Sequence, residues 1–327
     1  MLEIIASFIK QAIIQGIPLL YGSTGEILTE KSGNLNLGIP GIMYIGGISG
    51  VIGAYFYEKA VVDINPFLCV MIPLLCSILG SVLMALIYCF LTVTLRANQN
   101  VTGLVLTTFG VGVGNFFGGS LSSLFGEGGS ISLIRTGACF KATLPFASKL
   151  GLFGDTFLSF GFLAYLAIVI ALLCSWFLNR TRAGLSLRAV GESPATADAA
   201  GINVTKYKYL ATCIGAAIAG LGGLYFIMDY IGGAWTNGGF GDRGWLAIAL
   251  VIFALWKPKY SILGSILFGG LYIVYLYIPG LSRSSQEIFK MLPYVVTIVV
   301  LIVLSIRNRR ENQPPESLGL SYFREDR

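Results

Sequence analysis

The sequence predicts an all-α polytopic membrane protein, and three observations support this fold class. Hydrophobic residues make up 55% of the 327 residues, and charged residues only 12%, whereas a soluble domain carries about 25% charged residues. The mean hydropathy is +0.78. Several apolar runs approach the ~20 residues that a helix needs to cross a bilayer. A lipid membrane is therefore the expected environment.

About nine transmembrane helices are expected, at residues 3–27, 38–58, 67–91, 99–119, 156–178, 206–228, 243–256, 260–279 and 290–306. They form one transmembrane domain over residues 1–306, followed by a polar, partly disordered tail at 307–327. The +6 net charge indicates topology rather than nucleic-acid binding, because the cations cluster between the spans. With the basic loop 179–208 in the cytoplasm, the inner side holds about twice as many Lys and Arg residues as the outer side. We therefore expect a multi-pass protein of the cell membrane, with its N-terminus outside and its C-terminus inside.

The composition argues against an enzyme. The chain has no histidine, and its six cysteines lie mostly in or beside apolar spans. This excludes His-based acid–base chemistry and His metal sites. A Gly-x4-Gly-Lys-Ser/Thr loop for ATP phosphates is also missing from the sequence. We expect no cofactor and no metal in this chain.

The basic segment 179–208 interrupts the apolar sequence at mid-chain and contains a short helix with clear ends. Ser193 can cap the helix, Pro194 fits its first position, and Gly201 can end it. One interpretation is an ordinary surface loop with a single helical turn. We favour a docking helix for a cytoplasmic protein, because a short helix displayed between two spans needs a partner to hold it. The residues assigned to this docking surface are Arg188, Gly191, Glu192, Ser193, Pro194, Ala197, Ala200 and Gly201.

Two glycine-rich polar segments break the apolar pattern, at residues 29–41 and 232–244. Spans 1–4 and 6–9 form two four-helix sets of opposite orientation, so the two breaks occupy equivalent places in an inverted repeat. Paired breaks of this kind point to a transport pathway near the membrane midplane. The alternative is two ordinary turns.

Polar and aromatic residues at and near the breaks are candidates to line a pathway. Amide side chains donate and accept hydrogen bonds, which suits a neutral ligand with hydroxyls or ring nitrogens. Aromatic rings can stack on a flat ligand, or they belong to the interfacial aromatic belt. Asp242 beside Arg243 is most simply an exposed rim ion pair, and alternatively an outer gate. The candidate set is Asn34, Asn36, Asn98, Gln99, Thr102, Phe116, Arg243 and Trp245.

Two carboxylates near the inner end of span 1, Glu26 and Glu30, are candidate proton carriers. The plainer interpretation pairs Glu30 with the adjacent Lys31 at the inner rim. Acidic residues do not recur through the spans as a ladder, so the energy for transport is expected to come from elsewhere. Residues 120–155 form the longest loop, placed outside, with flexible glycines at Gly126 to Gly129.

Five motifs, in order along almost the whole chain, resemble those of the permease subunits of bacterial ABC importers for nucleosides and simple sugars. This family is paired with basic-membrane-protein-type lipoproteins and belongs to the branched-chain amino acid/ribose permease superfamily. The motifs are Glu30-Lys31-Ser32-Gly33 with Asn36-Leu37-Gly38 and Gly41-Ile42-Met43; Asn98-Gln99-Asn100-Val101-Thr102-Gly103; Arg188-Ala189-Val190-Gly191-Glu192 to Ala200-Gly201-Ile202-Asn203-Val204; Arg243-Gly244-Trp245 through Trp256-Lys257-Pro258; and Met291-Leu292-Pro293-Tyr294 with Leu318-Gly319 and Tyr322.

The resemblance implies a pump in which two permeases, usually different chains, form the pathway. Two ATPase subunits would bind ATP and the docking helices, and an external substrate-binding lipoprotein would deliver the ligand. The implied fold is similar to that of cobalamin-type importers. One departure is Pro40, which stands where the family usually carries Glu and is expected to add a rigid kink. The alternatives are an ion-coupled secondary transporter or channel acting without an ATPase, and a membrane scaffold that transports nothing.

Overall fold

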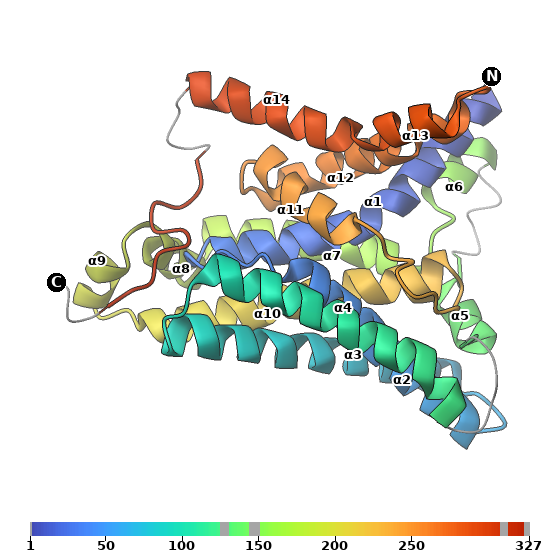
Figure 1. Ribbon diagram of the computed structural model, residues 1–327, viewed down its shortest axis with the longest axis horizontal. Helices are drawn as coiled ribbons and strands as arrows, with labels where there is room; N and C mark the ends of the chain where they lie inside the picture. The colour runs from blue at the N-terminus through green and yellow to red at the C-terminus, as the bar shows by residue number, and fades with distance from the viewer. Residues whose placement is uncertain (1, 125–130, 144–150, 308–312, 324–327) are drawn as a thin grey trace.

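The computed structural model describes residues 2–124, 131–143, 151–307 and 313–323, and within these ranges the chain is a helical bundle (Figure 1). Among the described residues, eight helical segments are long and apolar enough to cross a membrane. They are α1 (Leu2–Glu30), α2 (Ile39–Ala60), α3 (Pro66–Cys89) with η1 (Phe90–Thr94), α4 (Gln99–Leu124), α7 (Phe162–Arg180), α10 (Val204–Tyr225) with η3 (Phe226–Tyr230), α12 (Pro258–Ile273) with η4 (Val274–Tyr277), and α13 (Arg283–Lys290) with α14 (Leu292–Arg307). The predicted all-α polytopic fold is confirmed.

The seventh expected span, at 243–256, forms the short apolar helix α11 (Arg243–Phe253). Its 11 residues rise about 16 Å at 1.5 Å per residue, roughly half of the 30 Å hydrocarbon core. The helix therefore cannot span the membrane alone, as its length in the sequence indicates.

Four short helices lie at the two ends of the bundle. α8 (Arg182–Glu192) and α9 (Pro194–Ala199) lie at one end together with the described part of the tail, and α5 (Ile134–Phe140) and α6 (Gly151–Phe157) lie at the other. The long loop expected at 120–155 thus contains two helices. Gly126 to Gly129, expected to be flexible, lie outside the described residues.

The helix packing has the symmetry that an inverted repeat requires. In this repeat α1, α2, α3 and α4 correspond to α10, α11, α12 and α14. α1 packs against α12 as α10 packs against α3, and α10 contacts α2 as α1 contacts α11. The pairs α2–α4 and α11–α14 also correspond, and α1 packs along its own counterpart α10. Exchanging the two sets therefore reproduces the contacts.

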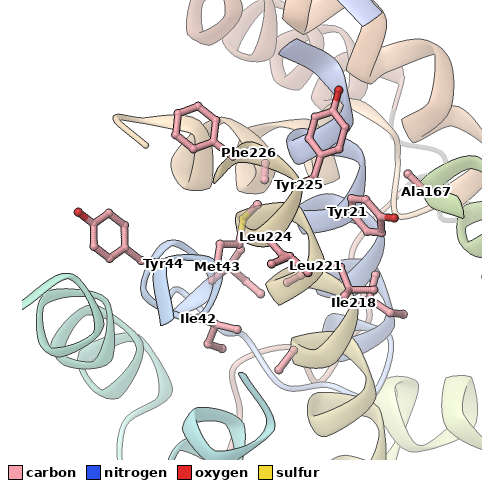
Figure 2. Packing of buried hydrophobic residues seen from close by; sticks show 14 of the residues in the cluster. Tyr21, Ile42, Met43, Tyr44, Ala167, Ile218, Leu221, Leu224, Tyr225 and Phe226 are labelled. Atoms are coloured by element: carbon pink, nitrogen blue, oxygen red, sulfur yellow. The ribbon is translucent and has the colours of Figure 1, made fainter. Parts of the chain in front are cut away.

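The central pair α1–α10 approaches closely because glycines face each other. A Cβ atom on Gly25 would meet the carbonyl oxygen of Gly215, and one on Gly215 would meet the carbonyl oxygen of Gly25. Small residues allow this approach in lipid, where apolar burial adds little between helices. Around the pair, Tyr21, Met43 and Leu224 bring α1, α2 and α10 together (Figure 2).

Candidate functional site

The predicted docking helix is present as α9, with the predicted ends. The Ser193 hydroxyl oxygen accepts a hydrogen bond from the Thr196 amide at 3.4 Å, and Pro194 opens the helix. Gly201 follows with φ +82°, and its amide donates to the Asp198 carbonyl at 2.9 Å. Local chemistry thus sets both ends of α9.

The residues of α9 divide into a buried and an exposed face. Ala197 is only 3% exposed and packs with Val190 and Val204. Ala195, Thr196 and Ala199 are exposed. Ala197 therefore holds the helix on the protein, while the small exposed residues present a surface on which a partner can lie. Ala200 and Glu192 are also exposed.

The helix α8, which the sequence pattern did not indicate, connects α9 to the first break. Thr181 caps α8 by accepting from the Gly184 amide at 3.0 Å. At its other end Gly191 is buried, and a Cβ there would meet the backbone of Lys31 and Gly33. A shift of α8 therefore reaches the break directly.

The described part of the tail, 313–323, lies across both elements and has ordered contacts. The Ser317 amide donates to the Gly191 carbonyl at 3.1 Å, and the Gly319 amide donates to the Gly33 carbonyl at 3.2 Å. The Tyr322 hydroxyl donates to the Asp198 carboxylate at 2.8 Å. In these residues the expected disorder is replaced by a strap that joins the docking helices to the first break.

The amides at the first break hold it to three neighbouring helices. The Asn34 amide group donates to the Thr212 hydroxyl on α10 at 3.0 Å. The Gln99 carbonyl oxygen on α4 accepts from the Leu35 amide at 2.7 Å. The Glu26 carboxylate on α1 accepts from the Asn36 amide at 3.1 Å. In this conformation the candidate residues Asn34, Asn36 and Gln99 are buried and hold the first break to the neighbouring helices.

Some hydrogen-bonding capacity remains in this cluster. The Asn34 carbonyl oxygen, the Asn36 amide nitrogen and one Glu26 oxygen are buried without a protein partner. Nearby on α4, Asn98 is exposed and caps the helix by accepting from the Val101 amide at 3.1 Å, while Thr102 is buried.

The hydrogen-bond partner of Glu30 is Trp256, and not the adjacent Lys31 of the inner-rim interpretation. The indole N–H of Trp256 donates to the Glu30 carboxylate, and both side chains are buried. Leu255 and Trp256 have φ values of +56° and +53°, a left-handed conformation that is uncommon for such residues. Backbone strain of this kind is tolerated where surrounding contacts fix the position.

At the second break Arg243 turns inward, so the expected rim ion pair with Asp242 is wrong. Its Nη2 and Nε atoms donate to the Gln15 side-chain oxygen at 2.9 and 3.3 Å. Its Nη1 donates to the Phe240 carbonyl at 2.9 Å, and the guanidinium lies 4.5 Å from the centre of the Phe226 ring. Arg243 is 7% exposed, whereas Asp242 is exposed. Trp245, in the first turn of α11, is half-buried.

Tyr44 joins the second break to α2 and α4, a role that the sequence did not indicate. Its hydroxyl donates to the Asn115 side-chain oxygen at 2.5 Å and accepts from the Gly238 amide at 2.9 Å. Figure 2 shows the Tyr44 ring directed away from the α1–α10 core. The recess that it lines with Trp235 and Phe226 has a cavity volume of about 10 Å³, about enough for one water molecule. The aromatic rings therefore fill the recess themselves.

The two breaks meet where α2 and α11 begin. A Cβ on Gly244, in the first turn of α11, would meet Pro40 in the first turn of α2. Because Pro40 lies in the first turn, its missing N–H removes no intrahelical hydrogen bond. The expected kink is therefore not imposed on α2. Helix N-termini carry partial positive charge, and paired ones mark binding positions in many transporter folds.

The outward faces of α3 and α4 differ in chemistry. On α3 the exposed positions are apolar, among them Leu75, Leu79 and Leu83, as lipid contact requires. At the start of α4 and along it, the exposed positions mix polar or small residues with large apolar ones: Asn98, Thr108, Gly112 and Gly119 with Val101, Leu104, Val105, Phe109 and Phe116. This mixed face is the most suitable described surface for a polar solute or a second subunit.

The comparisons with known proteins agree with this architecture. Residues 8–301 match the family described as branched-chain amino acid transport system / permease component. The chain is 32% identical over 297 residues, 90% of each chain, to a nucleoside ABC transporter permease of Lactococcus lactis subsp. cremoris. It is 31% identical over 344 residues, 98% of each chain, to a putative glucose ABC transporter permease of Haloferax volcanii. It is 28% identical over 304 residues, 91% of this chain and 92% of the other, to a guanosine ABC transporter permease of Bacillus subtilis.

These matches cover the transmembrane bundle together with both breaks and the docking helices. The chain therefore belongs to the branched-chain amino acid transport permease family and is a multi-pass membrane permease of the ABC transporter class.

Proposed function

We propose that this chain is the membrane subunit of an ATP-driven importer for nucleosides or a related small polar solute such as a simple sugar. The observation that carries the proposal is α9, a capped helix with an exposed face of small residues, at the same end as α8 and the tail. Relatives named for nucleosides, guanosine and glucose support the solute class.

In this proposal two separate ATPase subunits bind and hydrolyse ATP, and the chain itself needs no cofactor. Each ATPase contacts the exposed face of α9 from the cytoplasm, so the N-terminus lies outside and the C-terminus inside. The excess of Lys and Arg at this end supports the orientation. When the ATPases close, they displace α8 and α9. The contact of Gly191 with Lys31 passes the displacement to the first break and changes the opening of the pathway.

The remaining parts of the proposed importer are a second, different permease and an external substrate-binding lipoprotein. The mixed face of α4, with Asn98 and Phe116, would line the pathway shared with the second permease. Gln99, Thr102, Asn34 and Asn36 lie behind that face and would become accessible when the first break moves. Arg243 and Trp245 would act near the meeting point of the two breaks.

The docking step is tested by Ala199→Glu in the co-expressed transporter. A bulky charge on the exposed face of α9 should abolish co-purification of the ATPase and solute uptake, while membrane insertion remains normal. The matched control is Val62→Glu, because Val62 is 90% exposed in the α2–α3 connection at the opposite end. Unchanged uptake in the Ala199 variant would contradict the docking role.

The energy source and the solute need separate assays. Solute flux through the purified chain in liposomes, driven by an ion gradient without any ATPase, would support the alternative of a secondary transporter or channel. Retained activity after both breaks are replaced with Leu and Ala would support a scaffold. Competition of nucleosides and pentoses for uptake would identify the solute class.

A further inference from the structure

A basic pocket lies beside the docking helices, where the first break begins. Its volume is about 510 Å³, and three cations from three different segments line it: Lys31 after α1, Arg188 on α8, and Lys257 before α12. Glu192 is the acidic residue in the same lining. Among the described residues of this lining, positive charge exceeds negative charge, and the pocket suits an anion.

Two further observations, on Arg188 and Lys31, support an anion at this site. The Nε atom of Arg188 is buried and has no hydrogen-bond partner. Burial lowers the pKa of Lys31 most, and Arg188 and Lys257 lower it further, while Glu192 and Glu30 raise it. A bound anion would offset this repulsion and accept the free Arg188 donor.

An apolar cavity of about 140 Å³ lies further along the same helices. It is lined by Leu20 on α1, Ile168 on α7, and Ile262 and Ile266 on α12. α7 and α12 pack against each other, so both cavities belong to one seam. Along α1, Leu20 and Lys31 are about 16 Å apart at 1.5 Å per residue. This matches the acyl layer of one leaflet, about half of a 30 Å hydrocarbon core.

We propose that this α7–α12 seam binds an anionic phospholipid, with its phosphate among Lys31, Arg188 and Lys257 and an acyl chain in the apolar cavity. Leu178, Leu185 and Pro258 line the basic pocket beside the cations, which fits an amphiphile better than a free ion. The outer face of α7, including Leu172, Leu173 and Trp176, is exposed for lipid contact. The cytoplasmic leaflet supplies anionic headgroups at this side.

The headgroup is tested by titrating the purified full chain, in phosphatidylcholine nanodiscs, with dioleoyl-phosphatidylglycerol and reading binding by native mass spectrometry and thermal unfolding. Wild type should bind phosphatidylglycerol saturably and in preference to phosphatidylcholine. Lys257→Gln should weaken this binding about fivefold, since each cation near an anionic lipid contributes about that factor. The matched control, Lys259→Gln, removes an exposed lysine outside the pocket and should leave affinity unchanged.

The position of the acyl chain is tested with variants that do not change the charge of the protein. Ile266→Trp fills the apolar cavity and should weaken phosphatidylglycerol binding, whereas Leu267→Trp, at a neighbouring position that is 45% exposed, should not. If the first variant fails to fold, Ile262→Phe with Leu263→Phe as its control gives the same comparison, because Leu263 is 74% exposed.

Four results would overturn the proposal. Equal affinity for the two lipids would show that the cations do not select a headgroup. Equal weakening by the Lys257 and Lys259 variants would indicate general surface charge. Stabilisation by inorganic phosphate as strong as that by phosphatidylglycerol would identify a free anion. An ATPase that co-purifies less with Lys257→Gln, without selective lipid binding, would assign the pocket to an acidic protein segment. None of these results bears on transport by the pathway.

Discussion

The two breaks occupy equivalent places in the inverted repeat, but different groups hold them. The first, at 29–41, is tied by side chains of Glu26, Gln99 and Thr212 from three helices. The second, at 232–244, turns through several glycines with positive φ, such as Gly233 and Gly238, whereas the first has one, Gly33. Glycine at such a position lets the backbone reverse without a side chain in the way. The main fixed charge of the second break is Arg243, held by Gln15.

Their neighbours also differ. The first break contacts the docking helix through Gly191 and the tail through Gly319. The second break contacts the segment before α5, where the Leu133 amide donates to the Gly233 carbonyl at 2.9 Å. The same position in the repeat thus contacts the docking helix in the first break and the segment before α5, at the opposite end of the bundle, in the second. The Pro40–Gly244 contact is where motion in one can reach the other.

The largest effect is expected when a larger side chain overpacks the contact between Gly191 and the first break. Gly191→Val places side-chain atoms against the backbone of Lys31 and Gly33, which cannot move cheaply. The free energy of unfolding should fall by about 3 kcal/mol, the upper range for overpacking, and uptake should be lost. Gly112→Val is the stability control, because a Cβ there meets nothing within 4 Å. Equal stability of both variants, measured by thermal unfolding, would contradict the close contact of Gly191 with the first break.

A smaller effect is expected at the second break from Gln15→Leu. The change leaves the buried Arg243 guanidinium without the acceptor of two hydrogen bonds. Hydrogen bonds to charged groups contribute about 2 kcal/mol, so stability should fall by that amount while ATPase co-purification remains normal. Gln11→Leu, one turn earlier on α1 and half-buried, is the control. Loss of ATPase binding in the Gln15 variant would contradict the separation of the two breaks.

A local effect is expected from Tyr322→Phe, which removes the hydrogen bond from the tail to Asp198. The loss is about 1.5 kcal/mol, the lower end for a hydrogen bond to a charged group, and should appear as about tenfold faster hydrogen exchange in the tail, with little change in global stability. Tyr207→Phe is the control, since Tyr207 packs in the same cluster. Unchanged exchange would show that the other tail contacts, among them the backbone bonds to Gly191 and Gly33, are sufficient to hold the strap.

Sequence reasoning succeeded where the determinants are local. The ends of α9 follow from Ser193, Pro194 and Gly201, which act on their own backbone neighbours. The span positions follow from apolar runs of the required length. The inverted repeat was also accessible, because the two breaks are recognisable by composition.

The rest depends on contacts between residues far apart in the chain. Arg243 was assigned to its neighbour Asp242, whereas its partner Gln15 comes from the first helix. The tail is polar and rich in proline, so nothing local indicates order, and its bonds to Gly33 exist only in the folded bundle. Tyr44 lacks a local signal for the same reason. The sequence thus indicated the segments in which these residues lie, but not their partners.

The smallest effect is a change of stability with pH. It differs between the two breaks because the first holds a lysine and the second an arginine. Burial holds the pKa of Lys31 below its usual 10.5, while an arginine such as Arg243 stays charged throughout. Between the lowered pKa and 10.5 the unfolded chain binds more protons at Lys31 than the folded chain, so the free energy of unfolding should rise with pH across that window. Lys31→Met should flatten the rise, and Lys259→Met, which removes an exposed charge, should not. Chemical denaturation from pH 8 to 10.5 measures both slopes. A Lys31→Met slope equal to wild type would mean that the first break carries no buried titrating charge. Added phosphatidylglycerol should flatten the wild-type slope too, because a bound phosphate favours the charged lysine.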